Sequence, residues 1–280
     1  MRQVDTRAEV RATLQESRLA GARVALVPTM GFLHEGHLSL IDRARERADC
    51  VVVSIFVNPL QFGPTEDLER YPRSIERDFE LASARGADLL FTPNVTEMYP
   101  DGEPRVSVAP GLEAERLCGA TRAGHFRGVL TVVAKLFGIV QPDAAVFGQK
   151  DFQQAVLIRR MVRDLDMQID VDIAPTVREP DGLALSSRNV YLFAAERTRA
   201  RALFAGLTRC QALFSSGETD AEVLRATLLH LLAVPGVEAE YAEVVDADTF
   251  APVRRVIPGT VCAVAARVGT TRLIDNLVLV

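Results

Sequence analysis

Cysteine is scarce in this sequence, and its four cysteines are widely separated. Cys50, Cys118, Cys210 and Cys262 form no C-x-x-C pair. The spacing that builds a zinc ribbon, or the framework of a small disulfide-bonded domain, is therefore absent. Such a pattern is typical of proteins from a reducing compartment, and we expect a cytoplasmic location.

Long apolar segments are also lacking. No apolar run approaches the roughly 18 to 20 residues that a helix needs to cross a bilayer, although a hydrophobic content of 48% is enough to fill a core. The N-terminal residues alternate charged with apolar side chains, whereas a secretory leader has a basic start followed by an apolar block. The sequence predicts neither a membrane span nor a secretory signal.

An excess of positive charge is the third absence. The chain has 32 lysines and arginines against 37 aspartates and glutamates, for a formal net charge of -5. No overall positive field would gather nucleic acid or anionic lipid. An anionic ligand must therefore be held by a local site.

What is present is a regular alternation of strand and helix patterns up to residue 175. The run at 50–57 is apolar throughout, as in a strand that is covered on both faces of a parallel sheet. Further strands are expected at 23–27, 88–91, 143–147 and 168–173. Helices are expected at 6–20, 36–48, 74–85, 128–140 and 152–165. This alternation predicts an α/β fold, a mostly parallel sheet with helices on both faces.

The order of elements changes after Pro175. Two helical patterns, at 194–214 and 221–232, are followed by strand-like stretches at 237–246, 261–268 and 272–280. Consecutive helices followed by consecutive strands predict a smaller α+β domain. We therefore expect one domain over residues 1–175 and another over 176–280.

The segment PTMGFLHEGH, residues 28–37, follows the first of these strands directly. His34 and His37 lie three apart at the start of a helix, beside free backbone N–H groups and the positive end of the helix dipole. Gly36 would let the chain pass close to a nucleotide. Ligands of open α/β sheets bind at the carboxyl ends of strands, so the segment predicts a phosphate site. Two alternatives stay open here: surface histidines, or a zinc site completed by His125.

The next strand ends in Asn58-Pro59-Leu60-Gln61. Asn58 and Gln61 offer neutral donors and acceptors that suit a hydroxyl-bearing carboxylic acid. The alternative is an ordinary turn, since Asn-Pro often begins one.

The segment VFGQKDFQQ, residues 146–154, again joins a strand to a helix. Lys150 could reach a phosphate at the edge of the sheet, and Asp151 could cap the helix or meet a ribose hydroxyl or a metal ion. Gln154 lies one turn into the helix, where its amide could reach the same cleft. A lysine in this position can also be merely solvated.

Two further segments carry cationic side chains. In DGLALSSRN, residues 181–189, a glycine, two hydroxyls and Arg188 predict a mobile phosphate clamp, although such a loop can also be a plain linker. In TRAGHFRG, residues 121–128, Arg122 and His125 form another cluster, for which the alternative is a solvated loop.

Together these segments resemble the pantoate-beta-alanine ligase family of the HIGH-motif nucleotidyltransferases. PTMGFLHEGH is similar to that family's variant of the HIGH motif, and LALSSRN to its counterpart of the KMSKS loop. VVVSIFVNPLQF, YPR, GHFRGV, VFGQKDFQQ and RLIDN add further matches. Two departures stand out: Gln149 replaces an acidic residue expected before the lysine, and Ala123 replaces a proline.

The resemblance implies a Rossmann-like doubly wound parallel sheet that binds ATP and pantoate, with a smaller C-terminal lid domain. It also implies an ATP-dependent condensation of pantoate with β-alanine through a pantoyl-adenylate, with Mg²⁺ accompanying ATP and no other metal. The partners would be these small molecules and a second copy in a homodimer, and neither nucleic acid nor membrane.

Residue roles follow from the same resemblance. The catalytic residues would be His34, His37, Lys150 and Arg188, with His37 as a proton donor. Pantoate would contact Asn58, Gln61 and Gln154, and β-alanine would contact Gln61. Arg122 and His125 would stand near the amine or the pyrophosphate. ATP would contact Pro28, Thr29, Met30, Gly31, Phe32, Leu33, His34, Glu35, Gly36, His37, Gly148, Gln149, Lys150, Asp151, Val177, Leu185, Ser186, Ser187 and Arg188. Two rival functions remain: a zinc hydrolase, and a nucleotide-binding module without catalysis.

Overall fold

A computed structural model describes residues 1–64 and 66–280, and these form two compact units. The N-terminal unit comprises Met1–Pro110, Arg122–Gly148 and Leu157–Pro175. The C-terminal unit comprises Gly111–Thr121, Gln149–Val156 and Thr176–Val280. The division at residue 175 into a substrate-binding domain and a lid stays a prediction.

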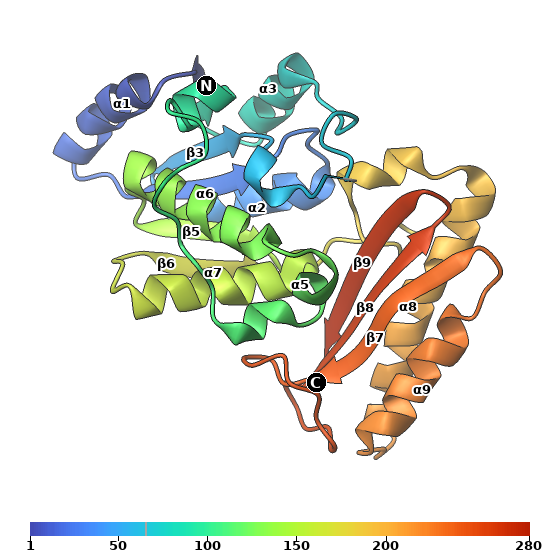
Figure 1. Cartoon of the computed structure of the whole chain (residues 1–280). Coiled ribbons are helices and arrows are strands. Elements are labelled where there is room, and N and C mark those ends of the chain that lie inside the picture. Colours follow the sequence, from blue (N-terminus) through green and yellow to red (C-terminus); the bar gives the residue numbers. More distant parts are fainter. Residues whose placement is uncertain (65) are drawn as a thin grey trace. The chain divides into compact units, whose positions relative to one another are not determined.

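Six parallel strands form the sheet of the N-terminal unit (Figure 1). They lie in the order β1-β4-β3-β2-β5-β6. From β2 the chain builds outward through β3 and β4 and then returns to the other side of β2 for β5. The direction of winding therefore reverses between β2 and β5. The strands are β1 (Arg2–Val4), β2 (Val24–Thr29), β3 (Cys50–Ile55), β4 (Leu89–Phe91), β5 (Ala144–Gly148) and β6 (Asp170–Ala174).

Helices cover both faces of this sheet. On one face α2 (Glu35–Arg45) packs on β2, β3 and β5, and it also contacts α3 (Ile75–Ala84). On the other face α6 (His125–Val140) packs on β2 and on α1 (Arg7–Leu19). Successive side chains of a strand point to opposite faces of the sheet, and β5 shows this for the two helical layers. Val146 packs in the core on the α2 side, and the next residue, Phe147, contacts Phe137 of α6.

Two shorter features complete the unit. Helix α4 (Val95–Met98) lies between β4 and α6 in the sequence, and the 3-10 helix η1 (Pro59–Gln61) follows β3. Helix α7 (Phe152–Asp164) follows β5, and its residues from Leu157 onward belong to this unit.

The C-terminal unit is a helical layer on an antiparallel sheet. Strands β7 (Val237–Val245), β8 (Val261–Val268) and β9 (Thr271–Val278) pair in that order. Helix α8 (Ala194–Ser215) packs on β8 and β9, and α9 (Ala221–Leu232) on β7. Their buried leucines and the valines of the sheet form a core of their own. The unit also holds η2 (Leu112–Glu115), α5 (Cys118–Thr121), η3 (Gln149–Asp151) and η4 (Ser187–Tyr191).

The predicted classes, a doubly wound parallel α/β sheet and a smaller α+β unit, are confirmed. Strand β1 was not predicted because three residues give too short a pattern. Helix α6 begins at His125 instead of residue 128, because Gly124 adopts a left-handed conformation with φ 79° and starts the helix a turn earlier. Among the described residues no helix combines the length and apolarity that crossing a bilayer requires.

Candidate active site

The polar segments predicted from the sequence follow the carboxyl ends of neighbouring parallel strands. Strand β2 ends at Thr29, β3 at Ile55 and β5 at Gly148, and β2 pairs in parallel with each of the other two. These ends lie at the same edge of the sheet. The reversal of winding between β2 and β5 is the place where open α/β sheets bind their ligands.

A buried carboxylate holds the loop between β2 and α2. Asp78 of α3 is fully buried and accepts the backbone N–H groups of Phe32 and Leu33, both at 2.7 Å. Burial raises the pKa of Asp78, and these two N–H groups oppose that effect only in part. Gly31, at φ +85°, lies so close that an added Cβ would stand 2.8 Å from Ile55 Cγ2. The loop conformation therefore depends on a glycine and on an acidic residue 46 positions away.

The two histidines of this loop lie against each other. His34 is the N-cap residue of α2, and His37 completes the first turn, with its N–H donated to the His34 carbonyl at 2.7 Å. The ring centroids are 4.0 Å apart, and both residues are half-buried. The predicted common face is confirmed, and it lies beside the positive end of the helix dipole.

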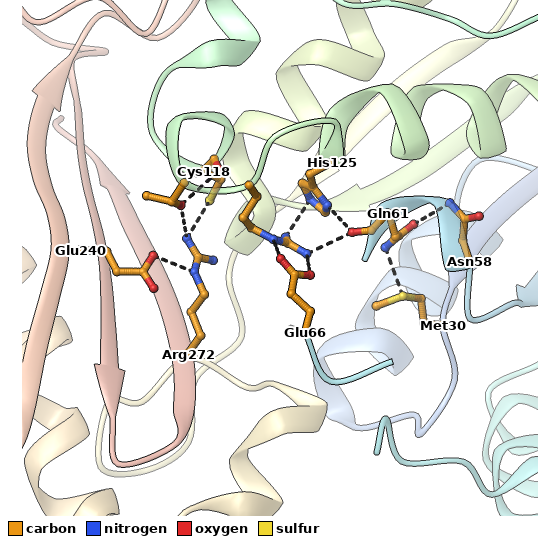
Figure 2. Close-up of polar contacts among 10 residues, drawn as sticks. Met30, Asn58, Gln61, Glu66, Cys118, His125, Glu240 and Arg272 are labelled. Carbon is orange, nitrogen blue, oxygen red and sulfur yellow. Dashed lines mark hydrogen bonds and ion pairs between the residues drawn. The ribbon is translucent and has the colours of Figure 1, made fainter. Parts of the chain in front are cut away.

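Gln61 meets the same loop from η1, just after β3. Its amide nitrogen donates to the sulfur of Met30 at 3.1 Å, and its oxygen accepts from Asn58 Nδ2 at 3.1 Å. Figure 2 shows these three side chains together. Gln61 is half-buried, so its amide lies next to the predicted ATP loop with part of its surface accessible.

Asn58 has a different environment from Gln61. It is 1% exposed, and its amide also donates to the Gly128 carbonyl at 3.2 Å. Its oxygen accepts the Tyr99 hydroxyl at 2.8 Å and the Leu60 N–H at 3.3 Å. Burial raises the pKa of Tyr99, which keeps the hydroxyl protonated as a donor. Asn58 thus begins the turn and orients Gln61; its contact with pantoate stays a prediction.

Helix α6 approaches η1 very closely. A Cβ added to Gly128 would stand 2.2 Å from the Leu60 carbonyl oxygen and 2.8 Å from the Gln61 nitrogen. Only a glycine permits this distance. The glycine of the GHFRGV segment therefore fixes where Gln61 stands, a role that its sequence spacing did not reveal.

Arg122, Glu66 and His125 form a network on the backbone of Gln61. Figure 2 labels Glu66, His125 and Gln61 of this network. The Arg122 guanidinium donates to Glu66 at 2.7 and 2.5 Å. His125, buried at the start of α6, has Nδ1 2.8 Å from the Gln61 carbonyl and Nε2 2.9 Å from Arg122 Nη1. A carbonyl only accepts and a guanidinium only donates, so the Nδ1–H tautomer fits.

This network bears on two sequence predictions. Burial alone would raise the pKa of Glu66, but the hydrogen bonds and the charge of Arg122 outweigh it and lower that pKa. Both ring nitrogens of His125 are committed to protein partners, and among the described residues no three His, Cys, Asp or Glu side chains are grouped for a metal ion. A zinc site with His34, His37 and His125 therefore has no support in this geometry, and the solvated-loop alternative is wrong for His125.

In the C-terminal unit, Lys150 lies in η3, two residues after the end of β5. Its ammonium is 3.6 Å from Asp151, and its side chain is 21% exposed. The carbonyls of Gln149 and Lys150 both accept from Asn276 Nδ2 of β9, at 2.9 and 3.0 Å. Asn276 of the RLIDN segment therefore holds the backbone at Lys150 of the VFGQKDFQQ segment.

The predicted phosphate clamp is built on a small hairpin. Arg178 and Ala184 form an antiparallel bridge, and Leu185 donates its N–H to the Val177 carbonyl at 3.0 Å. Gly182, at φ +91°, makes the turn. Ser186 then caps η4 by accepting the Arg188 N–H at 3.3 Å. Motion of this segment stays a prediction.

The adjacent glutamines at the start of α7 have opposite surroundings. Gln153 is 6% exposed and ties α7 to the 111–121 segment through the Cys118 N–H at 3.1 Å and the Arg116 carbonyl at 2.8 Å. Gln154, the predicted pantoate ligand, is half-buried. The structure thus separates an anchoring glutamine from one with accessible surface.

Two groups of predicted residues result. In the N-terminal unit the structure brings together Met30, Asn58, Gln61, Arg122 and His125, beside the loop that carries His34 and His37. In the C-terminal unit Lys150 shares an anchor with the 177–188 segment. Sequence reasoning assigned no role to the residues that hold these groups in place, although four of them lie in the GHFRGV, VFGQKDFQQ and RLIDN segments. These residues are Asp78, Tyr99, Gly128, Gln153, Arg178, Asp275 and Asn276.

Comparisons with known proteins agree with this geometry. A family model described as pantoate-beta-alanine ligase matches residues 2–278. A pantothenate synthetase of Geobacter sulfurreducens is 51% identical over 284 aligned positions, covering 100% of this chain and 99% of that protein.

Solved structures give the same result. A pantothenate synthetase of Thermus thermophilus has a TM-score of 0.93 and 48% identity, with 99% of each chain covered. A pantoate-beta-alanine ligase of Francisella tularensis, solved with beta-gamma ATP and beta-alanine, has a TM-score of 0.81 and 33% identity, covering 99% of this chain and 97% of that one. The chain therefore belongs to the pantoate-beta-alanine ligase family, whose members are the enzymes called pantothenate synthetases.

Proposed function

We propose that this ligase uses ATP to join pantoate to β-alanine through a pantoyl-adenylate, releasing pyrophosphate and then AMP. The observation that carries the proposal is the contact of Gln61 with Met30. This contact brings Gln61, the residue predicted to bind pantoate, against the loop predicted to bind ATP. Both lie near the place where the winding of the sheet reverses between β2 and β5. A Francisella relative that was solved with beta-gamma ATP and beta-alanine supports the choice of ligands.

In the first step a carboxylate oxygen of pantoate attacks the α-phosphorus of ATP, and the bond to pyrophosphate breaks. Negative charge accumulates on the phosphate oxygens, so positioned donors and cations lower the barrier. His34 and His37 supply two imidazoles beside a helix N-terminus. Lys150 and Arg188 supply the cations, and we propose that they act on the same nucleotide.

In the second step the β-alanine amine attacks the acyl carbon, and AMP leaves. Water would destroy the acyl-adenylate, so the site must close until the amine arrives. The C-terminal domain, residues 176–280, is the proposed lid, and its 177–188 segment would close over the nucleotide. We place the amine near Gln61, where Arg122 and His125 hold the backbone.

ATP and its metal fit the residues present. The loop after β2 packs closely on Ile55 through Gly31, and Asp78 keeps its backbone fixed for a nucleotide. Mg²⁺ would arrive as MgATP, since this ion is commonly bound through substrate phosphates and one or two carboxylates. Asp151, 47% exposed beside Lys150, is the carboxylate within η3 that could complete its shell. Homodimeric assembly remains a prediction from the family resemblance, and cytoplasmic location a prediction from the cysteine pattern.

A three-substrate assay tests the reaction. Incubation with MgATP, pantoate and β-alanine should release AMP and a condensation product of the expected mass. Omitting β-alanine should leave a bound adenylate and pyrophosphate. A nucleotide-binding module would bind ATP and release no AMP, and a zinc hydrolase would copurify with near-stoichiometric zinc.

The orientation of the cleft has its own test. Gln61→Ala should weaken the apparent affinity for pantoate more than that for ATP, because the Gln61 amide is assigned to the acid. Initial rates at varied concentrations of each substrate measure the difference. A larger effect on ATP would mean that the proposed cleft is oriented wrongly.

A further inference from the structure

The side-chain amide of Asn276 is buried, and its nitrogen donates to the backbone of η3, the segment that contains Lys150. It is 4% exposed, and its Nδ2 donates to both the Gln149 and Lys150 carbonyls. The Gln149 amide returns a longer contact, 3.4 Å, to the Asn276 oxygen. One side chain of β9 therefore fixes two successive peptide groups, and through them the point from which the Lys150 side chain leaves the chain.

A buried ion pair holds Asn276 in turn. Asp275 is 4% exposed, and it accepts both the Asn276 N–H at 2.8 Å and the two terminal nitrogens of Arg178 at 2.5 and 2.9 Å. A bidentate pair of this kind fixes direction as well as distance. Burial raises the pKa of Asp275, and the Arg178 guanidinium and the Asn276 N–H oppose that effect only in part.

Arg178 also belongs to the other predicted nucleotide segment. It lies on the 177–185 hairpin, donates to the Gly182 carbonyl at 3.2 Å, and its guanidinium lies 4.0 Å from the centroid of the Phe204 ring. Asn276, Asp275 and Arg178 thus connect η3 to the base of the segment that leads to Arg188. None of these three side chains has a part in the proposed chemistry.

We propose that Asn276, held by the Arg178–Asp275 pair, is a positioning residue that sets where the Lys150 ammonium stands and fixes η3 relative to the 177–188 hairpin. This inference rests on the proposed role of Lys150 at the ATP phosphates. The antiparallel sheet then supplies part of the phosphate-binding apparatus, in addition to any action as a lid. A displacement of about 1 Å can cost about a hundredfold in rate, so the anchor has a measurable consequence.

The near-isosteric variant Asn276→Asp tests the donor function. It keeps the side-chain volume but presents oxygen where Nδ2 donated to two carbonyls. We expect adenylation, measured as ATP–pyrophosphate exchange, to fall between about tenfold and about a hundredfold. The apparent affinity for ATP should weaken more than that for pantoate. A purely structural role would lower the melting temperature without this split between substrates.

A double-mutant cycle identifies the route of the effect. If Asn276 acts through Lys150, then Asn276→Asp should weaken ATP binding in the native background and have little further effect in Lys150→Ala. Calorimetric titration with MgATP measures this even where turnover is lost. Equal losses in both backgrounds would overturn the inference while leaving the proposed reaction intact. Unchanged adenylation in Lys150→Ala would remove the proposed role of Lys150 and the inference with it.

A matched amide provides the control. Gln211 of α8 also clamps backbone in this unit, donating to the Val280 carbonyl at 2.8 Å and accepting the Val280 N–H at 3.2 Å. Gln211→Ala should leave ATP affinity and exchange unchanged. If Gln211→Ala weakens ATP binding as much as Asn276→Asp does, then losing any side-chain hydrogen bond to backbone in this unit is enough to weaken it. That result would refute a specific role for Asn276.

Discussion

At the scale of single residues, the polar side chains divide into those that hold backbone and those with accessible surface. Asn58, Asp78, Gln153 and Asn276 are between 0% and 6% exposed, and each has backbone groups among its partners. Among the residues assigned to substrates, His37 and Gln61 are half-buried, whereas Asn58 holds backbone although it is also a predicted pantoate contact. Burial and hydrogen bonding therefore distinguish Gln61 from the residues that position it.

His37 gives the most direct prediction for the chemistry. Its imidazole lies at the start of α2, 4.0 Å from that of His34 between ring centroids. His37→Ala should cut adenylation by at least about a hundredfold, as expected when a charge-stabilising or proton-donating group is lost. Circular dichroism and the melting temperature should stay close to native. Near-normal pyrophosphate release would count strongly against the assignment.

The adjacent residues Gln153 and Gln154 allow a matched comparison of a side chain that holds backbone with one that has accessible surface. Gln154→Ala should raise the apparent Michaelis constant for pantoate and leave the melting temperature unchanged. Gln153→Ala should remove about 1 to 3 kcal/mol of stability, because the Cys118 N–H loses its acceptor in a buried site. Denaturant unfolding and substrate kinetics on both variants check this. The opposite pattern would exchange the two assignments.

At the scale of secondary structure, sequence patterns predicted the helices and strands but not the tertiary contacts that orient the loops between them. Helix α1 begins close to the predicted residue 6, because its start signal, the capping box of Thr6 and Glu9, lies within four residues. The carboxyl ends of β2, β3 and β5 were predicted because apolar runs stop there. The roles of Asp78 and Asn276 were not predicted, since their partners lie 46 and 126 residues away and no local sequence period marks such contacts.

Glycines in α6 show how such a contact can be tested. Gly128→Ala would place a Cβ 2.2 Å from the Leu60 carbonyl oxygen. We expect η1 to shift, the Michaelis constant for pantoate to rise, and stability to fall by about 1 to 3 kcal/mol. Chemical denaturation and initial rates measure the two effects.

The same helix contains the control for this substitution. Gly138 is exposed, and an added Cβ there would meet nothing within 4 Å. Gly138→Ala should be neutral or stabilising by up to about 1 kcal/mol, since alanine has the higher helix propensity. Equal effects at both positions would show that helix propensity, and not the approach of α6 to η1, governs Gly128.

At the scale of the whole molecule, two units with separate cores each carry part of the predicted site. His34, His37 and Gln61 belong to the N-terminal unit, and Lys150 and Arg188 to the C-terminal unit. Under the proposed reaction one adenylate would contact both sets, and its binding would therefore stabilise both units together.

Hydrogen exchange can test this coupling without turnover. Adding MgATP and pantoate, without β-alanine, should slow amide exchange in residues 30–37 and also in 148–151 and 185–188. The slower exchange should extend to both units because one adenylate would contact residues of each. In Lys150→Ala the protection of 148–151 and 185–188 should diminish, since the phosphates lose one of their two proposed cations. Protection confined to 30–37 in the native protein would mean that the C-terminal residues do not bind the nucleotide, and the site would then consist of the N-terminal unit alone.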